Sequence, residues 1–268
     1  LQYSVHERRR RWRDMSQGVP LTKGKMARDE FIESLPFNLT SAQESSLNEI
    51  IEDMKTDKPM ARMLQGDVGS GKTVVAVAAL ITTVLNGCQG ALMVPTEILA
   101  EQHFATFKKL LNHLPVLDSE EGMVTFGLSN GNSLTVGILV GSMKSKAKED
   151  MRSRLGNGSV DVVIGTQTII QSSVDFKSLA LIVVDEQHRF GVMQRSDLRS
   201  KGLKPHLLSM SATPIPRSLA LTLYGDLDMS IINQLPSGRQ EIKTRWISPD
   251  RREVAYNFVR EQVKLGRQ

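Results

Sequence analysis

Residues 66–73 of this 268-residue chain read Gly-Asp-Val-Gly-Ser-Gly-Lys-Thr, which matches the spacing G-x-x-x-x-G-K-S/T. Glycines let successive backbone N–H groups turn toward one anionic chain, and a following helix N-terminus adds positive potential. The motif predicts that Lys72 binds the β and γ phosphates of a nucleotide and that the Thr73 hydroxyl ligates Mg²⁺. A glycine-rich turn without a ligand is the alternative, but such a chance match has odds of about 1%. The predicted phosphate-binding residues are Gly66, Asp67, Val68, Gly69, Ser70, Gly71, Lys72 and Thr73.

A pair of acids, Asp185 and Glu186, follows the apolar run 181–184. At the carboxyl end of a strand beside the phosphate loop, Asp185 would bind Mg²⁺ and Glu186 would orient and deprotonate the attacking water. Two acids after a strand are common by themselves, but together with the phosphate loop they favour ATP hydrolysis over mere binding. Lys72, Asp185 and Glu186 are therefore the predicted catalytic residues.

A third apolar run, 207–210, ends at Ser211, Ala212 and Thr213. Their small hydroxyl side chains could bond to the acidic pair and report the state of the phosphate to the rest of the protein. The alternative interpretation is that they form a turn before Pro214.

The segments that must position these residues alternate short apolar runs with helical periodicity. Helices are expected from about Thr40 for about four turns, and over 72–86, 97–112 and 144–155. Strands are expected at 62–64, 91–94, 138–140, 160–164, 181–184 and 207–210. Val-, Ile- and Leu-rich strands flanked by helices indicate an α/β fold with a doubly wound, mostly parallel sheet and helices on both faces. Alternating residues around Asn130-Gly131 predict a hairpin over 122–137.

The charge of the chain is concentrated at its N-terminus. Residues 1–28 contain eight Lys or Arg and two acids, whereas the remaining residues contain 26 bases and 27 acids. This excludes a uniformly basic nucleic-acid coat. The chain has one cysteine and lacks an apolar run of the roughly 18 residues that a membrane helix needs. A cytoplasmic protein without a membrane partner is expected.

The motifs at 66–73, Asp185-Glu186-Gln187-His188 and Ser211-Ala212-Thr213 resemble motifs I, II and III of superfamily 2 helicases. The longer strings 35–43, 65–73, 185–192, 212–217 and 223–228 are similar to the RecG branch of that superfamily. The resemblance covers most of residues 35–245 and implies a RecA-like, P-loop NTPase domain.

The resemblance also implies roles for further residues. It implies that Gln43, with Phe37 and Thr40 nearby, reads adenine, and that Gln187 and His188 couple the nucleotide to Ser211, Ala212 and Thr213. Contacts with the DNA backbone are implied for Pro95, Thr96, Gly141, Ser142, Thr166 and Gln167. Gln167 stands where the family usually has a histidine. The stretch 114–136 is longer than usual in the family and is interpreted as a surface insertion rather than a DNA contact.

The resemblance implies three parts of the chain. Residues 1–34 would be a basic connector from a missing N-terminal wedge domain, and 35–235 the first RecA-like, ATP-binding helicase domain. Residues 236–268 would be a linker and the truncated start of the second helicase domain. Because the chain begins at Leu1 and stops just after a helical pattern, it is expected to be an excerpt of a longer polypeptide.

The implied activity is that of an ATP hydrolase and DNA helicase or translocase, which uses ATP and Mg²⁺ and remodels branched or duplex DNA at replication forks and Holliday junctions in recombination and repair. Alone, the chain is expected to be weakly active or inactive, because the second domain supplies the arginine fingers. Three alternatives stay open: the motor of a transcription-repair coupling translocase, a nucleotide-gated nucleic-acid-binding module without turnover, and an RNA helicase.

Overall fold

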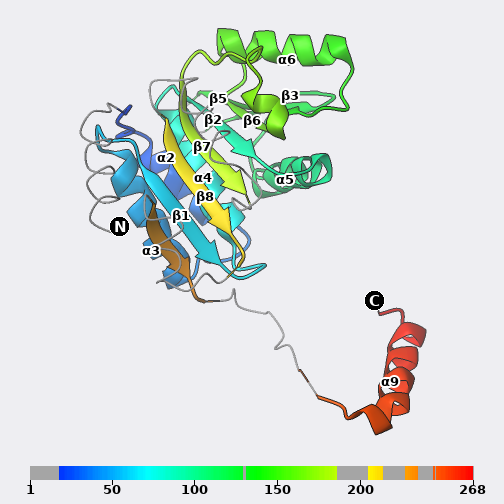
Figure 1. The fold of residues 1–268 in the computed structure, drawn as a ribbon. Helices are drawn as coiled ribbons and strands as arrows, with labels where there is room; N and C mark the ends of the chain where they lie inside the picture. The colour runs from blue at the N-terminus through cyan, green and yellow to red at the C-terminus, as the bar shows by residue number, and fades with distance from the viewer. Residues whose placement is uncertain are drawn as a thin grey trace, which may run out of the picture. The chain divides into compact units, whose positions relative to one another are not determined.

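The computed structural model describes residues 18–128, 131–185, 205–213, 227–234, 244 and 246–267. The chain divides into two compact units, Leu1–Pro236 and Ser237–Gln268. The first unit contains the sheet with its covering helices, and the second contains η3 (Pro249–Arg251) and α9 (Arg252–Lys264) (Figure 1).

The first unit is built on one mixed sheet. Within the described residues its strand order is β3-β4-β5-β6-β2-β7-β8-β1-β9. Neighbouring strands from β5 to β9 in this order pair in parallel, whereas β3–β4 and β4–β5 pair antiparallel. The strands are β1 (Ala61–Gly66), β2 (Gln89–Met93), β3 (Val116–Glu120), β4 (Met123–Gly127), β5 (Ser133–Leu139), β6 (Val162–Gly165), β7 (Leu179–Asp185), β8 (His206–Ser211) and β9 (Asp228–Ile232).

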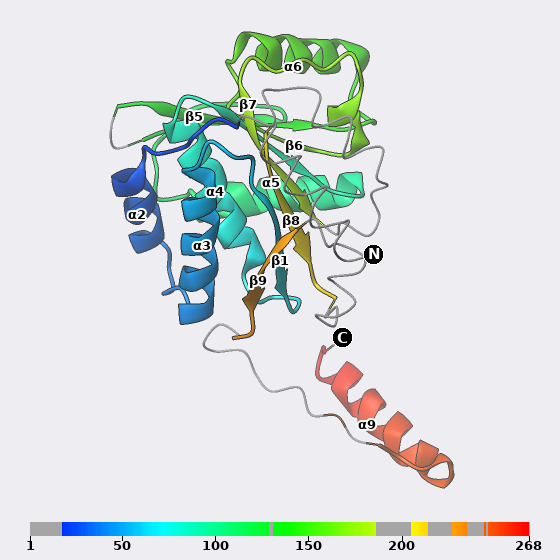
Figure 2. The same cartoon turned by 60° about the vertical axis from the view of Figure 1, so that its left-hand side comes forward.

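Helices cover both faces of this sheet. On one face, α2 (Lys25–Glu33), α3 (Ser41–Met54), α4 (Lys72–Leu85) and α5 (Glu97–Leu110) share a core with alternate strand residues such as Leu64 and Leu92. On the other face, α6 (Ser145–Asn157) and η1 (Gln167–Ile170) pack against the intervening strand residues, among them Met63 and Met93. Figure 2 shows α2, α3 and α4 side by side. The predicted α/β class and doubly wound sheet are confirmed.

Helix α4 occupies the centre of the first core. Its residues 74–83 are all buried, since the sequence from Val74 to Thr83 has apolar or small side chains on every side. The Thr82 and Thr83 hydroxyls donate to the carbonyls of Ala78 and Ala79, so burial leaves neither hydroxyl unpaired. The helix that follows the phosphate loop is thereby enclosed in the core over residues 74–83.

The predicted hairpin over 122–137 is present as β4 and β5, with Gly131 at φ 81° in the turn. Asn130 lies outside the described residues. Sequence reasoning did not predict β3, whose residues are all exposed and therefore lack an apolar alternation. Residues 116–139 extend the parallel sheet at an edge away from the phosphate loop.

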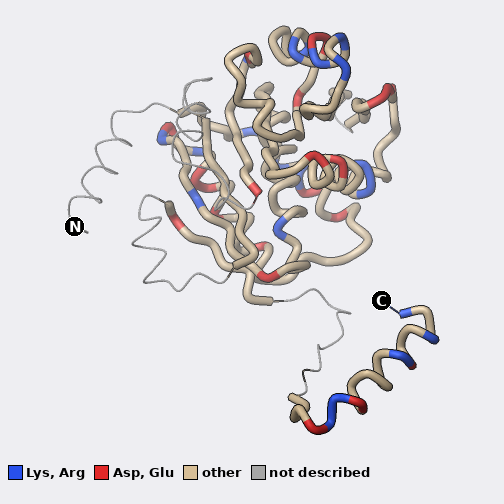
Figure 3. The backbone as a smooth tube through the Cα atoms, turned by 45° about the vertical axis from the view of Figure 1, so that its right-hand side comes forward, with Lys and Arg blue, Asp and Glu red and all other residues tan. Residues whose placement is uncertain are grey.

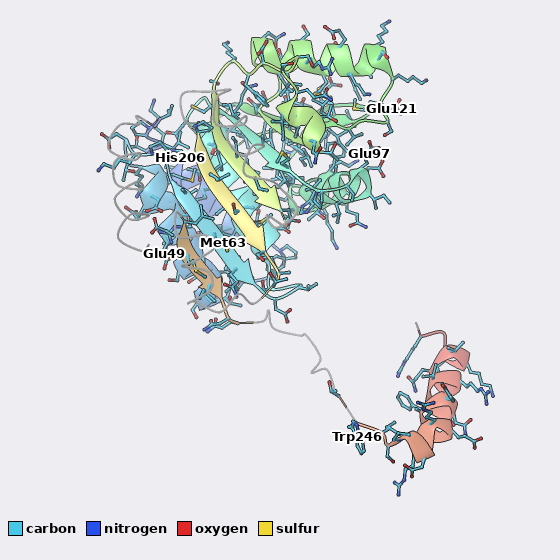
Figure 4. All side chains as sticks on the ribbon, viewed as in Figure 1. Glu49, Met63, Glu97, Glu121, His206 and Trp246 are labelled. Carbon is cyan, nitrogen blue, oxygen red and sulfur yellow. The ribbon has the colours of Figure 1, made fainter. Side chains whose placement is uncertain are left out.

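Strand β9 was also not predicted. It pairs in parallel with β1, and Arg62 of β1 links it to α3. Arg62 Nη1 donates to Glu49 Oε2 at 2.9 Å and to Ser230 Oγ at 2.8 Å, while Nε donates to Asp53 at 2.9 Å. Figure 4 labels Glu49 on α3 beside this strand. The largely buried guanidinium thus sets where the last strand joins the sheet.

The described part of the predicted connector, from residue 18 onward, packs on the first unit. Leu21 and Phe31 are buried in the core with α4, and the Leu21 amide donates to the Met54 carbonyl at 2.8 Å. His206 at the start of β8 accepts from the Met60 amide through Nδ1 and donates to the Val19 carbonyl through Nε2 (Figure 4). Burial lowers the pKa of His206, which favours the neutral ring that this pair of bonds requires. Residues 1–17, which hold the arginine cluster, lie outside the described residues.

Charged residues of both signs occur along α6 (Figure 3). In the described part of the chain, none of the helices combines the length and the apolar character needed to cross a bilayer.

Asp161, at the start of β6, gives a pH-dependent prediction. Its Oδ2 accepts from the Thr135 amide at 2.8 Å, and burial raises its pKa from 3.8 to about 6. Because the folded state holds the proton of Asp161 more tightly than the unfolded state, protonation favours folding. This contribution is complete below the unfolded pKa and is lost as the pH rises through the folded pKa. Asp161→Asn keeps an acceptor without the charge. It should raise the unfolding free energy by about 1–3 kcal/mol at pH 7, and by almost nothing near pH 4.

Urea denaturation of both proteins between about pH 4 and pH 8 measures this difference. The exposed Asp175→Asn variant serves as the control for loss of one negative charge and should show no such trend. A gain from Asp161→Asn that is equal at every pH would contradict the assignment.

Candidate functional site

The candidate site lies along one edge of the sheet, because the carboxyl ends of parallel strands meet there. The phosphate loop leaves β1 after Gly66, Asp185 ends β7, and Ser211 ends β8. The predicted DNA-contacting segments follow β2, β5 and β6 at the same edge. The pairings of Leu64 with Met210 and of Met210 with Asp185 put these three residues on one face of the sheet, the face that α4 covers. Asp185 therefore lies on the side of the sheet where α4 begins with Lys72 and Thr73.

The phosphate loop adopts a shape that only glycine permits at two positions. Gly69 has φ 75° and Gly71 has φ 86°, both in the left-handed region. A Cβ on Gly71 would come within 2.2 Å of Gln43 Nε2, and one on Gly66 within 2.5 Å of Ser70 Oγ. The loop is thus a tight turn that ends at the first residue of α4.

Lys72 folds over this loop. Its Nζ donates to the carbonyl oxygens of Gly66 at 2.7 Å and Asp67 at 2.9 Å. The ammonium group therefore stands above the loop beside the helix N-terminus, where positive potential concentrates. The three consecutive loop residues Asp67, Val68 and Gly69 are exposed.

Gln43 connects the start of α3 to the loop. It completes a capping box, in which Gln43 Oε1 accepts from the Thr40 amide at 2.8 Å and Thr40 Oγ1 accepts from the Gln43 amide at 3.3 Å. At the other end of the side chain, Nε2 donates to the Ser70 carbonyl at 2.7 Å. Gln43 is 1% exposed, while Phe37 is 42% exposed. Its contact with adenine stays a prediction, and the structure adds that it holds the loop backbone.

The residues present fit a nucleotide phosphate with Mg²⁺. Ser70 Oγ is buried and has no hydrogen-bond partner among the described residues, although it lies inside the loop. Thr73 is partly buried and the Asp185 side chain is 17% exposed, and each would offer one oxygen to the metal. Mg²⁺ is usually held by one or two carboxylates and substrate phosphates rather than by an all-protein cage. The described residues contain no group of three or more acids, histidines or cysteines that could hold a metal ion.

The residues predicted for coupling are described in part. Ser211 is buried, and its Oγ lies 2.9 Å from Thr213 Oγ1 and accepts from the Thr213 amide at 3.3 Å. These two bonds are those expected of a turn. Ala212, between Ser211 and Thr213, is half-exposed. Glu186, Gln187 and His188 lie outside the described residues, so their predicted roles rest on the sequence.

The three predicted DNA-contacting segments are bonded to one another. Glu97 Oε1 accepts from the Ser142 amide at 3.0 Å, and the Val94 amide donates to the Gly165 carbonyl at 2.9 Å. Thr96 caps α5 by accepting from the Leu99 amide at 3.3 Å. The predicted residues themselves are exposed or half-exposed: Pro95, Thr96, Gly141, Ser142, Thr166 and Gln167.

Sequence reasoning missed two residues that hold this site. Gln234, after β9, accepts at Oε1 from Ser41 Oγ at 3.0 Å and from the Ala42 amide at 3.3 Å, so it caps α3 from across the chain. No local signal could identify it, because the partners are 193 and 192 residues away. His103 lies 3.0 Å from Asp185. The sequence could have indicated His103, because it is a titratable residue at helical spacing between the apolar residues Ala100 and Phe107, on the face of α5 that is buried.

This fold and loop define a P-loop domain of the RecA-like class. The model of the DEAD/DEAH box helicase family matches residues 40–222. The chain belongs to the DEAD/DEAH box helicase family.

Its relatives include the ATP-dependent DNA helicases RecG of Bacillus subtilis and Thermotoga maritima. The first is 43% identical over 268 residues, which are 100% of this chain and 37% of that relative. The second is 46% identical over 260 residues, which are 97% of this chain and 31% of that relative. The chain therefore spans about a third of the length of these relatives. The RecG resemblance seen in the motifs is confirmed.

Among solved structures, RecG bound to a three-way DNA junction matches with a TM-score of 0.82 and 41% identity, over 99% of this chain and 33% of that chain. Mss116p bound to single-stranded RNA and AMP-PNP matches with a TM-score of 0.59 and 19% identity, over 93% of this chain and 53% of that one. The second likeness concerns the fold alone.

The cap made by Gln234 gives a stability prediction. Gln234→Ala removes the acceptor for two donors at the start of α3 and should lower the unfolding free energy by about 0.5–1 kcal/mol. Gln234→Glu keeps the acceptor and puts a negative charge at a helix N-terminus, so its stability should equal or exceed that of the wild type. Urea denaturation measures both, and Asn233→Ala, an exposed neighbour, is the matched control. If Gln234→Ala and Gln234→Glu lose the same unfolding free energy, the acceptor that only the Glu variant keeps contributes nothing to stability.

Proposed function

We propose that this chain is the first RecA-like, ATP-binding motor domain of an ATP-dependent DNA helicase or translocase that remodels branched DNA, such as replication forks and Holliday junctions, in recombination and repair. The observation that carries the proposal is the phosphate loop closed by Gln43, with Asp185 on the same side of the sheet. The similarity to RecG, including a structure bound to a DNA junction, supports DNA as the nucleic acid. A cytoplasmic location belongs to the same proposal.

ATP binding would use groups that are already in place. Lys72 would exchange the Gly66 and Asp67 carbonyls for phosphate oxygens. The loop amides and the Ser70 hydroxyl would donate to the same phosphates. Mg²⁺, when bound, neutralises charge on the phosphates, and Thr73 and Asp185 would hold it. Glu186 would accept the proton of the attacking water.

DNA binding would use the backbone of the nucleic acid only. Thr96 accepts through its hydroxyl within α5 and keeps its own proton to donate, and Gln167 is exposed at the start of η1. Together with Pro95, Gly141, Ser142 and Thr166, they would contact phosphates or sugars, which carry no sequence information. A motor that moves along any sequence requires such contacts.

The proposed protein contains further domains. Residues 1–34 would connect a preceding wedge domain to the motor domain. Residues 236–268 would be a linker and the start of a second RecA-like domain, which would supply arginine fingers. Helix α9 supports a further domain at this end, because its apolar side chains Val254, Phe258, Val259 and Val263 are each more than half exposed. Such a set of exposed apolar residues is typical of a surface that another element covers. Hydrolysis by the 268-residue chain alone should be weak.

The phosphate loop is tested by Lys72→Ala. In the full-length protein this variant should lose DNA-stimulated ATP hydrolysis by about 10²-fold or more, because removal of one preorganised donor of this kind costs that much. Phosphate release with and without junction DNA measures the effect. Lys109→Ala, which removes an exposed lysine of α5, is the control and should keep wild-type activity. Hydrolysis that survives Lys72→Ala would refute the role given to the loop.

Glu186→Gln separates a motor from a nucleotide-gated binding module. The variant keeps the size and a polar oxygen but cannot take up the proton of water. It should therefore bind ATP with wild-type affinity and hydrolyse it about 10²–10⁴-fold more slowly. A fluorescent ATP analogue and single-turnover hydrolysis in the full-length protein give the two quantities. If neither the wild type nor Glu186→Gln hydrolyses ATP, the module without turnover is favoured, whereas equally fast hydrolysis in both would refute the role given to Glu186.

A further inference from the structure

His103 stands at the boundary between the nucleotide site and the helix that begins at a predicted DNA contact. Its Nε2 lies 3.0 Å from Asp185 Oδ2, and the two side chains are 10% and 17% exposed. An ionised carboxylate can only accept hydrogen bonds, so Nε2 carries the proton in this pair. A largely buried, charge-assisted bond of this length fixes the plane of the carboxyl group.

The helix that carries His103 cannot easily shift by itself. Ala100 and Phe107, one turn to either side, are buried in the core beneath the sheet. At its start, Thr96 caps the helix and Glu97 accepts from the Ser142 amide. His103 lies six positions after Glu97, a rise of about 9 Å along the helix. Helix α5 therefore joins the segments at 96–97 and 141–142 to Asp185 through one continuous element.

We propose that His103 is a positioning residue for Asp185: it orients the carboxylate that would bind Mg²⁺ and connects that ligand to helix α5 and its first residues. This inference rests on the proposed function, since it assigns a partner to the same metal ligand. Hydrogen-bonded partners of metal ligands typically contribute 10–100-fold to metal affinity or activity. His103 touches neither nucleotide nor nucleic acid in this scheme and acts through Asp185.

The alternative is that His103 only fills space in the core, and two substitutions distinguish the possibilities. His103→Gln places an amide N–H near the position of Nε2, whereas His103→Asn places it near Nδ1, which is too short to reach Asp185. Both keep a polar side chain at the position, and His103→Ala removes it. His113→Ala is the matched control, because it removes an exposed imidazole that bonds to Ser34 instead.

The measurement is the affinity of each variant for Mn²⁺, used in place of Mg²⁺ and detected by EPR in the presence of saturating ADP. His103→Ala and His103→Asn should weaken Mn²⁺ binding by about 10–100-fold, while His103→Gln and His113→Ala should match the wild type. The affinity for ADP without metal should be the same in all variants. If His103→Gln is as weak as His103→Asn, if none of them changes Mn²⁺ binding, or if metal-free ADP affinity falls in parallel, the proposal is overturned.

A second readout uses the full-length protein. His103→Asn should lower the DNA-stimulated rate of ATP hydrolysis by about 10–100-fold without changing the DNA concentration that gives half-maximal stimulation. A loss of DNA affinity instead of turnover would place His103 at the nucleic acid and overturn the inference. Lys72→Ala distinguishes failure of the proposed function from failure of the inference about His103. If Lys72→Ala leaves ADP affinity and hydrolysis intact, the proposed function fails. If Lys72→Ala is inactive but the His103 variants behave as the wild type, only the inference about His103 fails.

Discussion

The parallel pairing of β5, β6, β2, β7, β8 and β1 is the constraint on which the rest of the structure depends. Parallel strands are covered by helices on both faces, and their backbone groups bond to neighbouring strands. Because the strands run in one direction, their carboxyl ends lie at one edge of the sheet. At this edge the spacing between strands is so close that Gly165 has no room for a side chain, because a Cβ would meet the Leu139 carbonyl at 2.0 Å. The phosphate loop, Asp185, Ser211 and the predicted DNA contacts each lie at or after the end of one of these strands, whereas Gln43 lies on α3, before β1.

The loops at the ends of these strands lack the regular backbone hydrogen bonds of helices and strands. Here side chains from other elements bond to them instead. Gln43 supports the Ser70 carbonyl, Glu97 supports the Ser142 amide, and Gln234 caps the helix that carries Gln43. His103 does the same for Asp185. Each bond joins two segments that lie far apart in the sequence, and each buried partner avoids the cost of an unpaired polar group. The phosphate loop, the predicted metal ligand Asp185 and the predicted DNA contacts thereby form one connected structure.

This arrangement explains which parts of the protein could be predicted from the sequence. The helix over 72–85 and the strand over 179–185 follow from long, continuous apolar patterns and from the glycines that begin α4. The hairpin followed from its turn residues. Strands β3 and β9 were missed because their residues are largely exposed or lie at an edge, where pairing with a neighbour rather than side-chain pattern makes the strand. The site motifs were found because they are contiguous.

By itself, the sequence determined the class of fold, the phosphate loop and the acidic pair, since each is a local pattern whose chemistry depends on neighbouring residues. The tertiary structure alone decided how those parts are held. The capping of α3 by Gln234, the bond from Gln43 to the loop and the contact of His103 with Asp185 depend on strand order and register, which bring together residues separated by 27 to 193 positions. No single stretch of residues encodes such a contact, because it exists only when the buried sheet fixes both partners in space.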